Sequence, residues 1–141
     1  MLKISSPLTK KKFIDCTFGG GSYFKEILKF SNTNVLAIDR DKKVLAEAKK
    51  IEKKYTNRFK FFQIKFSQLE TISTDNVDVI IFDLGLSSIQ LNNLNRGFSF
   101  KSNKKLNMTM GLNEISALDV INNLSELDLK RVIKILGDEK E

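Results

Sequence analysis

Residues 77–82 form an almost uninterrupted apolar run, VDVIIF, which leads directly into Asp83, Leu84 and Gly85. A strand this apolar is typical of a parallel sheet, because only a sheet covered on both faces buries both sides of its strands. In open sheets of this kind, ligands bind beyond the carboxyl ends of the strands. The run therefore predicts an α/β fold in which the loop after Phe82 contributes to a site.

Three further apolar segments precede this run, at residues 13–18, 34–38 and 59–64, and helical patterns follow the first two. Asp41 is expected to cap the second helix. The alternation predicts a parallel sheet in the order 3-2-1-4 with right-handed helical crossovers and helices on both faces. In this order the apolar run lies at an edge without a later strand to cover it, which indicates a fragment or a chain that needs a partner.

After Gly85 the chain continues through polar loops rich in Asn and Lys to two short helical segments. Ser125 begins a plausible capping box for the second of them. Gly137 is its expected end, because glycine is the common residue just past a helix C-terminus.

Composition narrows the classes of function. No apolar run approaches the ~20 residues of a membrane span. The N-terminus lacks a signal-peptide core, and the single cysteine fits a reducing compartment, so the expected location is the cytoplasm. With no histidine and one cysteine, neither a His-based metal site nor Ser–His or Cys–His catalysis is expected. The net charge of +7 slightly favours a phosphate-rich partner over a merely solvated surface.

A glycine-rich turn, DCTFGGG (residues 15–21), follows the first expected strand. Glycine lets the backbone approach a ligand closely, but the string completes neither a P-loop nor a G-x-G-x-x-G fingerprint. By itself it fits a binding site and an ordinary turn equally well. Asp39 ends the second expected strand about 20 residues later, where nucleoside-binding folds place an acid on ribose hydroxyls. Together the two features favour a nucleoside-like ligand.

Two more residues follow expected strands. Phe66 comes after the third strand and could stack on an adenine, although with 11 Phe in the chain a core position is favoured for it in isolation. Asp83 ends the fourth strand. It is expected to serve either the ligand or a reacting group, or simply to form the loop.

Four strings occur in the order and spacing of one family: DCTFGGG (15–21), AIDRD (37–41), FDLGLSSIQL (82–91) and RGFSF (96–100). On these strings the chain resembles the S-adenosylmethionine-dependent ribosomal RNA cytosine-N4 methyltransferases of the MraW or RsmH type. The resemblance implies the N-terminal part of a class I, Rossmann-like methyltransferase domain at residues 1–110 and the beginning of a truncated helical insertion at residues 111–141. It implies methylation of the exocyclic N4 amine of a cytidine in small-subunit (16S) ribosomal RNA, with the small ribosomal subunit as partner.

The resemblance also implies roles for individual residues. Asp39 is expected at the ribose of S-adenosylmethionine, Phe66 near its adenine, and Asp83 and Gln90 near its methionine end. Asp83 is in addition the expected catalytic residue, and Arg96 the expected RNA contact. The complete set of implied cofactor contacts is Gly21, Ser22, Tyr23, Asp39, Phe66, Asp83 and Gln90.

Several positions depart from the family pattern. Ser22 and Tyr23 stand where the family's glycine turn reads Gly-His, and Asn107 and Thr109 stand where it has an acid and an arginine. The segment expected before the first strand and the family's second half are absent. These departures predict a fragment with little activity of its own. The alternative is a non-catalytic relic or RNA-binding accessory domain that retains the fold, and a nicotinamide-dependent oxidoreductase is a weaker third possibility.

Overall fold

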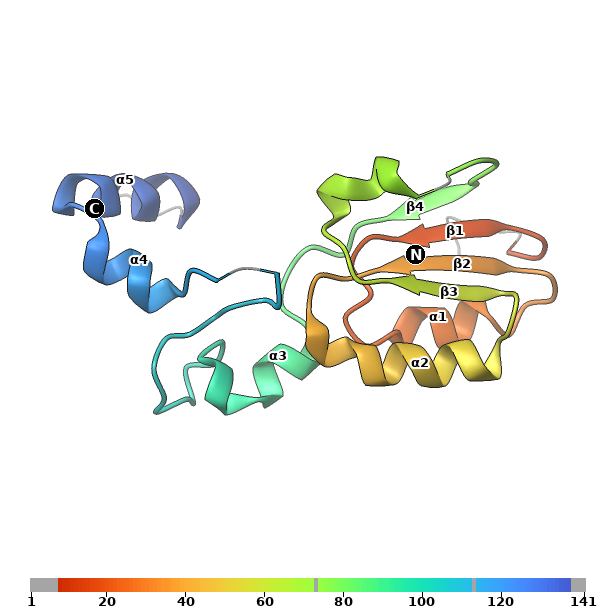
Figure 1. The fold of residues 1–141 in the computed structure, drawn as a ribbon, viewed down its shortest axis with the longest axis horizontal. Helices are drawn as coiled ribbons and strands as arrows, with labels where there is room; N and C mark the ends of the chain where they lie inside the picture. Colours follow the sequence, from red (N-terminus) through yellow and green to blue (C-terminus); the bar gives the residue numbers. More distant parts are fainter. Residues whose placement is uncertain (1–7, 73, 113, 138–141) are drawn as a thin grey trace.

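Four parallel strands form one sheet in the order β3-β2-β1-β4 (Figure 1). The structure, a computed structural model, describes residues 8–72, 74–112 and 114–137. Strand order and direction confirm the α/β architecture predicted from the sequence. The strands are β1 (Lys12–Asp15), β2 (Asn34–Ile38), β3 (Phe59–Phe62) and β4 (Val79–Ile81).

Short helices connect the strands and continue the chain beyond β4 (Figure 1). Asp41 caps the first of the two consecutive helices after β2, where its carboxylate accepts a hydrogen bond from the N–H of Lys43 at 3.1 Å, as predicted. The helices are α1 (Ser22–Ile27), η1 (Lys42–Val44), α2 (Leu45–Lys54), η2 (Phe66–Thr71), α3 (Ser88–Asn92), η3 (Leu94–Arg96), α4 (Ala117–Asn123) and α5 (Glu126–Leu136).

Alternate residues of the strands point to opposite faces of the sheet, and each face has its own core. Phe13 of β1 belongs to the larger core, together with Phe24 of α1 and Ala48 of α2. Its neighbour Ile14 belongs to the smaller core, beneath η2, where Leu69 packs. Figure 1 shows α1 and α2 running along one face of the sheet. Helical segments thus cover both faces, and the cover on the smaller core is a 3-10 helix.

Strand β4 is the edge of the sheet, as predicted. It pairs with β1 through the register Ile14↔Ile80, and no other described strand lies along its second edge. Ile80 is 46% exposed and Phe82 is 50% exposed, although both belong to the most apolar segment of the chain. An apolar strand left this open presents a pairing edge and an apolar surface to other polypeptides.

Helices α4 and α5 extend away from the sheet (Figure 1). Ser125 caps α5 by accepting a hydrogen bond from the N–H of Asp128 at 3.2 Å, and Gly137 is its C-cap, both as predicted. Neither helix has a buried side chain. In the described part of the chain, no helix has the length and apolar character needed to span a bilayer.

Candidate cofactor site

A cleft of about 650 Å³ lies where β1, β2 and β4 end, between the glycine turn and α3. The chain leaves β1 toward β2 on one side and pairs with β4 on the other, so the cleft is at the switch point of the sheet. Its volume is within the ordinary range for small-molecule sites. The predicted site residues that line it are Ser22, Tyr23, Asp39, Phe66, Asp83 and Gln90; Gly21 and Arg96 do not.

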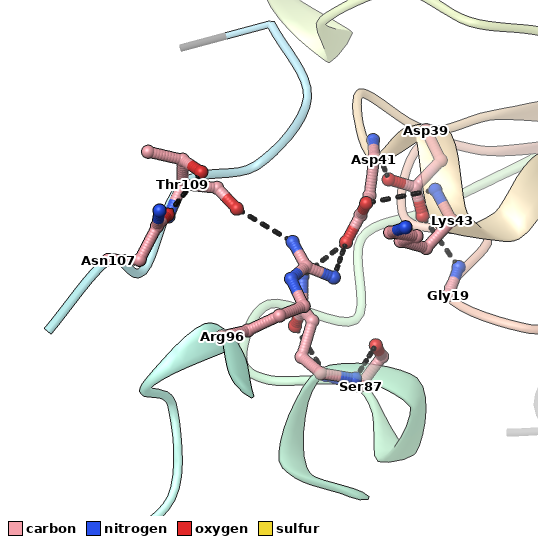
Figure 2. A network of polar contacts seen from close by, with 9 residues as sticks. Gly19, Asp39, Asp41, Lys43, Ser87, Arg96, Asn107 and Thr109 are labelled. Atoms are coloured by element: carbon pink, nitrogen blue, oxygen red, sulfur yellow. Dashed lines mark hydrogen bonds and ion pairs between the residues drawn. The ribbon is translucent and has the colours of Figure 1, made fainter. Parts of the chain in front are cut away.

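Asp39 stands at the carboxyl end of β2 with both carboxylate oxygens anchored (Figure 2). Oδ2 accepts a hydrogen bond from the N–H of Gly19 at 2.7 Å, and Oδ1 accepts one from the N–H of Asp41 at 2.8 Å. Burial raises the pKa of Asp39, while these N–H groups oppose the rise. A carboxylate has about four acceptor positions. Backbone N–H groups, that of Arg40 among them, occupy part of this capacity and leave the rest for the hydroxyls of a ribose.

Gly21 does not line the cleft; it shapes the turn that leads into α1. It is the residue before α1, with a φ of +74°, in the left-handed region that glycine adopts without strain. A Cβ at this position would lie 2.6 Å from the ring of Phe18 and 2.9 Å from Cδ1 of Ile51. The glycine therefore lets the start of α1 pack directly on Phe18. Its predicted contact with a cofactor stays a prediction.

Asp15, Thr17 and Asp83 form a hydrogen-bonded chain at the floor of the cleft. The Thr17 hydroxyl accepts a hydrogen bond from the N–H of Asp83 at 2.7 Å and donates one to Oδ1 of Asp15 at 3.2 Å. The N–H of Thr17 donates to the same oxygen at 2.8 Å. This arrangement turns the chain out of β1 at Asp15, so the strand ends three residues before the predicted limit at Phe18. It also fixes the backbone at Asp83.

Burial raises the pKa of Asp15 to about 7, and the carboxylates of Asp39 and Asp83 add to the rise against the hydrogen bonds from Thr17. Asp15 is only 2% exposed. Asp15 and Thr17 belong to the DCTFGGG string, but no role was predicted for either of them. Their spacing of two residues is the local signal for a carboxylate that accepts from the backbone two positions later.

Asp15→Asn is expected to change how stability depends on pH. In the unfolded chain Asp15 ionises near pH 3.8 and in the folded protein near pH 7, so its contribution to stability is complete below pH 3.8 and is lost as the pH rises to 7. Asparagine does not ionise. The free energy of unfolding of the Asp15→Asn variant, relative to that of wild type, should therefore rise by about 3 kcal/mol between pH 5 and pH 8. Urea denaturation at both values measures this, and Glu70→Gln, at an exposed acid, is the control; parallel profiles for Asp15→Asn and wild type would contradict it.

Two aromatic side chains of the cleft are open to a ligand. Tyr23 is 47% exposed and Phe66 is 45% exposed. The ring of Phe66 meets Phe82 edge to face, with centroids 5.7 Å apart. This contact orients the Phe66 ring at the cleft wall, a geometry that leaves one of its surfaces for a flat ligand.

Gln90 is 6% exposed and its amide group is engaged on both sides. Its Oε1 accepts a hydrogen bond from the N–H of Ser87 at 2.8 Å, and the Ser87 hydroxyl in turn accepts from the N–H of Gln90, which completes the capping box of α3. Its Nε2 donates to Oδ2 of Asp41 at 3.3 Å. Gln90 lines the cleft and at the same time links α3 to the segment after β2.

Arg96 forms a nearly buried ion pair with Asp41, at 2.5 Å between Nη1 and Oδ2 (Figure 2). Its Nη2 donates to the carbonyl oxygen of Thr109 at 2.7 Å, and its guanidinium lies 5.0 Å from the centre of the Phe98 ring. The predicted contact of Arg96 with RNA stays a prediction. Neither Asp41 nor the Thr109 carbonyl was predicted as a partner of Arg96.

Asn107 retains a local hydrogen-bonding role at a position where the family pattern has an acid. Its Oδ1 accepts from the N–H of Thr109 at 3.0 Å and also from the Thr109 hydroxyl. An amide oxygen therefore does here what a carboxylate oxygen would do for this turn. Met110, one residue further on, lines the cleft together with Arg40 and Glu47, and none of these three was predicted as a site residue.

Comparison with known proteins identifies the family. The model of the MraW methylase family matches residues 1–141. Relatives named ribosomal RNA small subunit methyltransferase H are 40% identical in Bartonella tribocorum, over 95% of this chain and 40% of the relative, and 40% identical in Ehrlichia canis, over 99% and 49%. The relative of that name in Orientia tsutsugamushi is 38% identical, over 100% of this chain and 46% of its own length. The chain thus spans less than half the length of these relatives, and it belongs to the MraW methylase family.

Proposed function

We propose that this chain is the cofactor-binding part of an S-adenosylmethionine-dependent methyltransferase that acts on the exocyclic N4 amine of a cytidine in small-subunit ribosomal RNA. The observation that carries the proposal is the convergence of the glycine turn, Asp39 and Asp83 on one cleft at the switch point of the sheet. The names of the relatives support ribosomal RNA as the target, and the net charge of +7 favours a polyanionic partner.

The residues of the cleft suit the three parts of S-adenosylmethionine. Asp39 supplies acceptors for the ribose diol, and Phe66 supplies a ring surface for the adenine. Asp83, exposed at the cleft, supplies negative charge for the cationic methionine end. The amide of Gln90, which also lines the cleft, supplies a neutral polar group beside it. Ser22 and Tyr23 complete the wall at the start of α1.

The bound cofactor would supply an electrophilic methyl group on a sulfonium. The cytosine amine is a poor nucleophile because its lone pair is delocalised into the ring. Rate enhancement therefore depends on holding the amine in line with the methyl group and on an acceptor that polarises its N–H. Asp83 is the residue that we assign as this acceptor, since its backbone is held by Thr17 and its side chain is exposed at the cleft.

We further propose that residues 1–110 are the N-terminal part of the methyltransferase domain and residues 111–141 the start of a helical insertion, working in the cytoplasm. The exposed edge of β4 and the share of the relatives that the chain spans support little turnover by these 141 residues alone. A non-catalytic relic or RNA-binding domain with the same fold is the alternative. The hydrogen bond that Asn107 accepts from the N–H of Thr109 favours descent from an active enzyme, because asparagine, which replaces the family's acid, still supports this turn.

Calorimetric titration of the purified chain with S-adenosylmethionine tests the proposal, with NAD as the control ligand. We expect saturable binding of S-adenosylmethionine and none of NAD. The cleft has one acid, Asp39, placed for the ribose of a single nucleoside, and its glycine turn does not complete the fingerprint that binds a dinucleotide pyrophosphate. Incubation of the chain with small ribosomal subunits and labelled S-adenosylmethionine should then leave no label above background. Preferential binding of NAD would reject the methyltransferase assignment, and robust labelling of a cytosine amine would reject the proposed dependence on further polypeptide.

A further inference from the structure

We propose that the Asp41–Arg96 ion pair is a positioning unit that seats residues 107–111 and so places Met110 in the wall of the cofactor cleft. Neither Asp41 nor Arg96 lines the cleft, so the role of the pair is to place other groups. The inference rests on the proposed function only for the identity of the ligand in the cleft. The placement of the wall depends on contacts within this chain.

The ion pair is held away from solvent, with the Arg96 side chain 11% exposed and the Asp41 side chain 3% exposed. Removing two charges from water costs several kcal/mol per ion, so a buried pair is a poor source of net stability. Its better-attested use is to select one arrangement of the groups around it, because each charge is tolerated only beside the other. The arrangement selected here joins the segment after β2 to the segment after α3.

Arg96 holds residues 107–111 from two directions. Its side chain donates to the carbonyl oxygen of Thr109 at 2.7 Å, and its own carbonyl oxygen accepts from the N–H of Met108 at 2.8 Å. Met110, the next residue after Thr109, lines the cleft. Figure 2 shows the guanidinium of Arg96 between Asp41 and the loop segment that carries Asn107 and Thr109.

Gly111 provides a second observation for close seating of this segment. Its φ is +53°, and a Cβ there would lie 2.5 Å from the carbonyl oxygen of Arg40 and 2.9 Å from the backbone nitrogen of Lys42. Gly111, at the end of this segment, therefore rests directly on the backbone that follows β2. A segment packed this closely on the residues next to Asp39 shapes the cleft through its own position.

Asp41 connects the pair to the cleft itself. Its carboxylate accepts from Gln90 at 3.3 Å, and its N–H donates to Asp39 at 2.8 Å. A second cavity, of about 410 Å³, is lined by Asp41 and Arg96 themselves, whereas Gln90 and Met110 line the cleft. The pair is thus part of the partition between the two cavities, and loss of the pair should loosen the cleft wall on this side.

Arg96→Met and Arg96→Lys test the proposal by amide hydrogen exchange without ligand and by titration with S-adenosylmethionine. Methionine removes the charge and the two side-chain hydrogen bonds, to Asp41 and to the Thr109 carbonyl, while keeping an unbranched side chain and the backbone bond to Met108. We expect exchange at residues 107–111 to become about tenfold faster, with exchange in β1 and β2 unchanged, and the dissociation constant to rise about tenfold. Lysine should give an intermediate result, since it keeps the charge but not the two-pronged geometry.

Arg58→Met is the matched control, because Arg58 also donates to two backbone carbonyls, those of Leu28 and Phe30, but outside the cleft. It should leave both readouts unchanged. A pair that only stabilised the fold would speed exchange in β1 and β2 as well, and this uniform response would overturn the proposal. Unchanged exchange at residues 107–111 in a folded Arg96→Met would overturn it too.

Asp41→Asn is the second variant if Arg96→Met does not fold. Asparagine keeps an acceptor oxygen for the N–H of Lys43, but it removes the charge and the second oxygen, which accepts from Gln90 and Arg96. Selectively faster exchange at residues 107–111 is again the expected result, and its absence overturns the proposal. The exchange measurement needs no ligand. If wild type failed to bind S-adenosylmethionine while the Arg96 variants loosened residues 107–111, the proposed function would fail and the positioning role of the pair would stand.

Discussion

Asp39→Ala is expected to weaken the binding of S-adenosylmethionine by about 1–3 kcal/mol, a factor of about 5–150 in the dissociation constant. The carboxylate has acceptor positions left for a ribose diol after those used by Gly19 and Asp41. Alanine removes the charge-assisted hydrogen bonds to the diol. It also releases the two N–H groups that order the glycine turn and the segment after β2. Isothermal titration at constant pH measures the effect.

Two variants separate the ribose contact from the loss of local order. Asp39→Asn keeps an acceptor for one backbone N–H and loses the charge, so its dissociation constant should lie between those of wild type and Asp39→Ala. Glu70→Ala removes an exposed acid of η2 that does not line the cleft and should bind like wild type. An unchanged dissociation constant in Asp39→Ala would show that the ribose is held elsewhere.

Gly21→Ala is expected to lower the free energy of unfolding by about 2–5 kcal/mol. A left-handed residue with a side chain costs about 1–2 kcal/mol, and forcing a methyl group into a filled site costs a further 1–3 kcal/mol. Here the new Cβ would meet the Phe18 ring at 2.6 Å and Ile51 at 2.9 Å, on the side of the sheet that holds the larger core. Urea denaturation followed by circular dichroism measures the loss.

Gly20→Ala is the matched control for this effect, one position earlier in the same turn. Its Cβ would approach only the end of the Ile89 side chain, at 3.3 Å, and Gly20 has no positive φ. The expected cost is below about 1 kcal/mol, because a flexible side-chain terminus can move aside. Equal losses in the two variants would contradict the assignment of a special packing role to Gly21.

The parallel sheet could be predicted from the sequence because its signals are local. Apolar runs at residues 34–38 and 77–82 and the helical spacing between the first three strands determine element type. The order of the strands was predicted from right-handed crossovers together with the family resemblance, and the structure confirms it. Strand ends were predicted less well. The first strand ends at Asp15 because Thr17 turns its N–H and hydroxyl to the Asp15 carboxylate, a choice that depends on where the N–H of Asp83 lies.

The placement of Asp39 and Asp83 at the cleft also follows from the sequence, since the carboxyl ends of parallel strands meet at one edge of a sheet. By itself, the sequence therefore determined the sheet, its order and which strand ends supply acids. Tertiary structure alone decided that Arg96 pairs with Asp41, which lies 55 residues earlier in the sequence. It also decided that Gly111 rests on the backbone after β2. The physical reason is that strand periodicity and crossover handedness act within a strand or between consecutive strands. A buried ion pair forms only where two loops, distant in the sequence, are packed closely enough to exclude water.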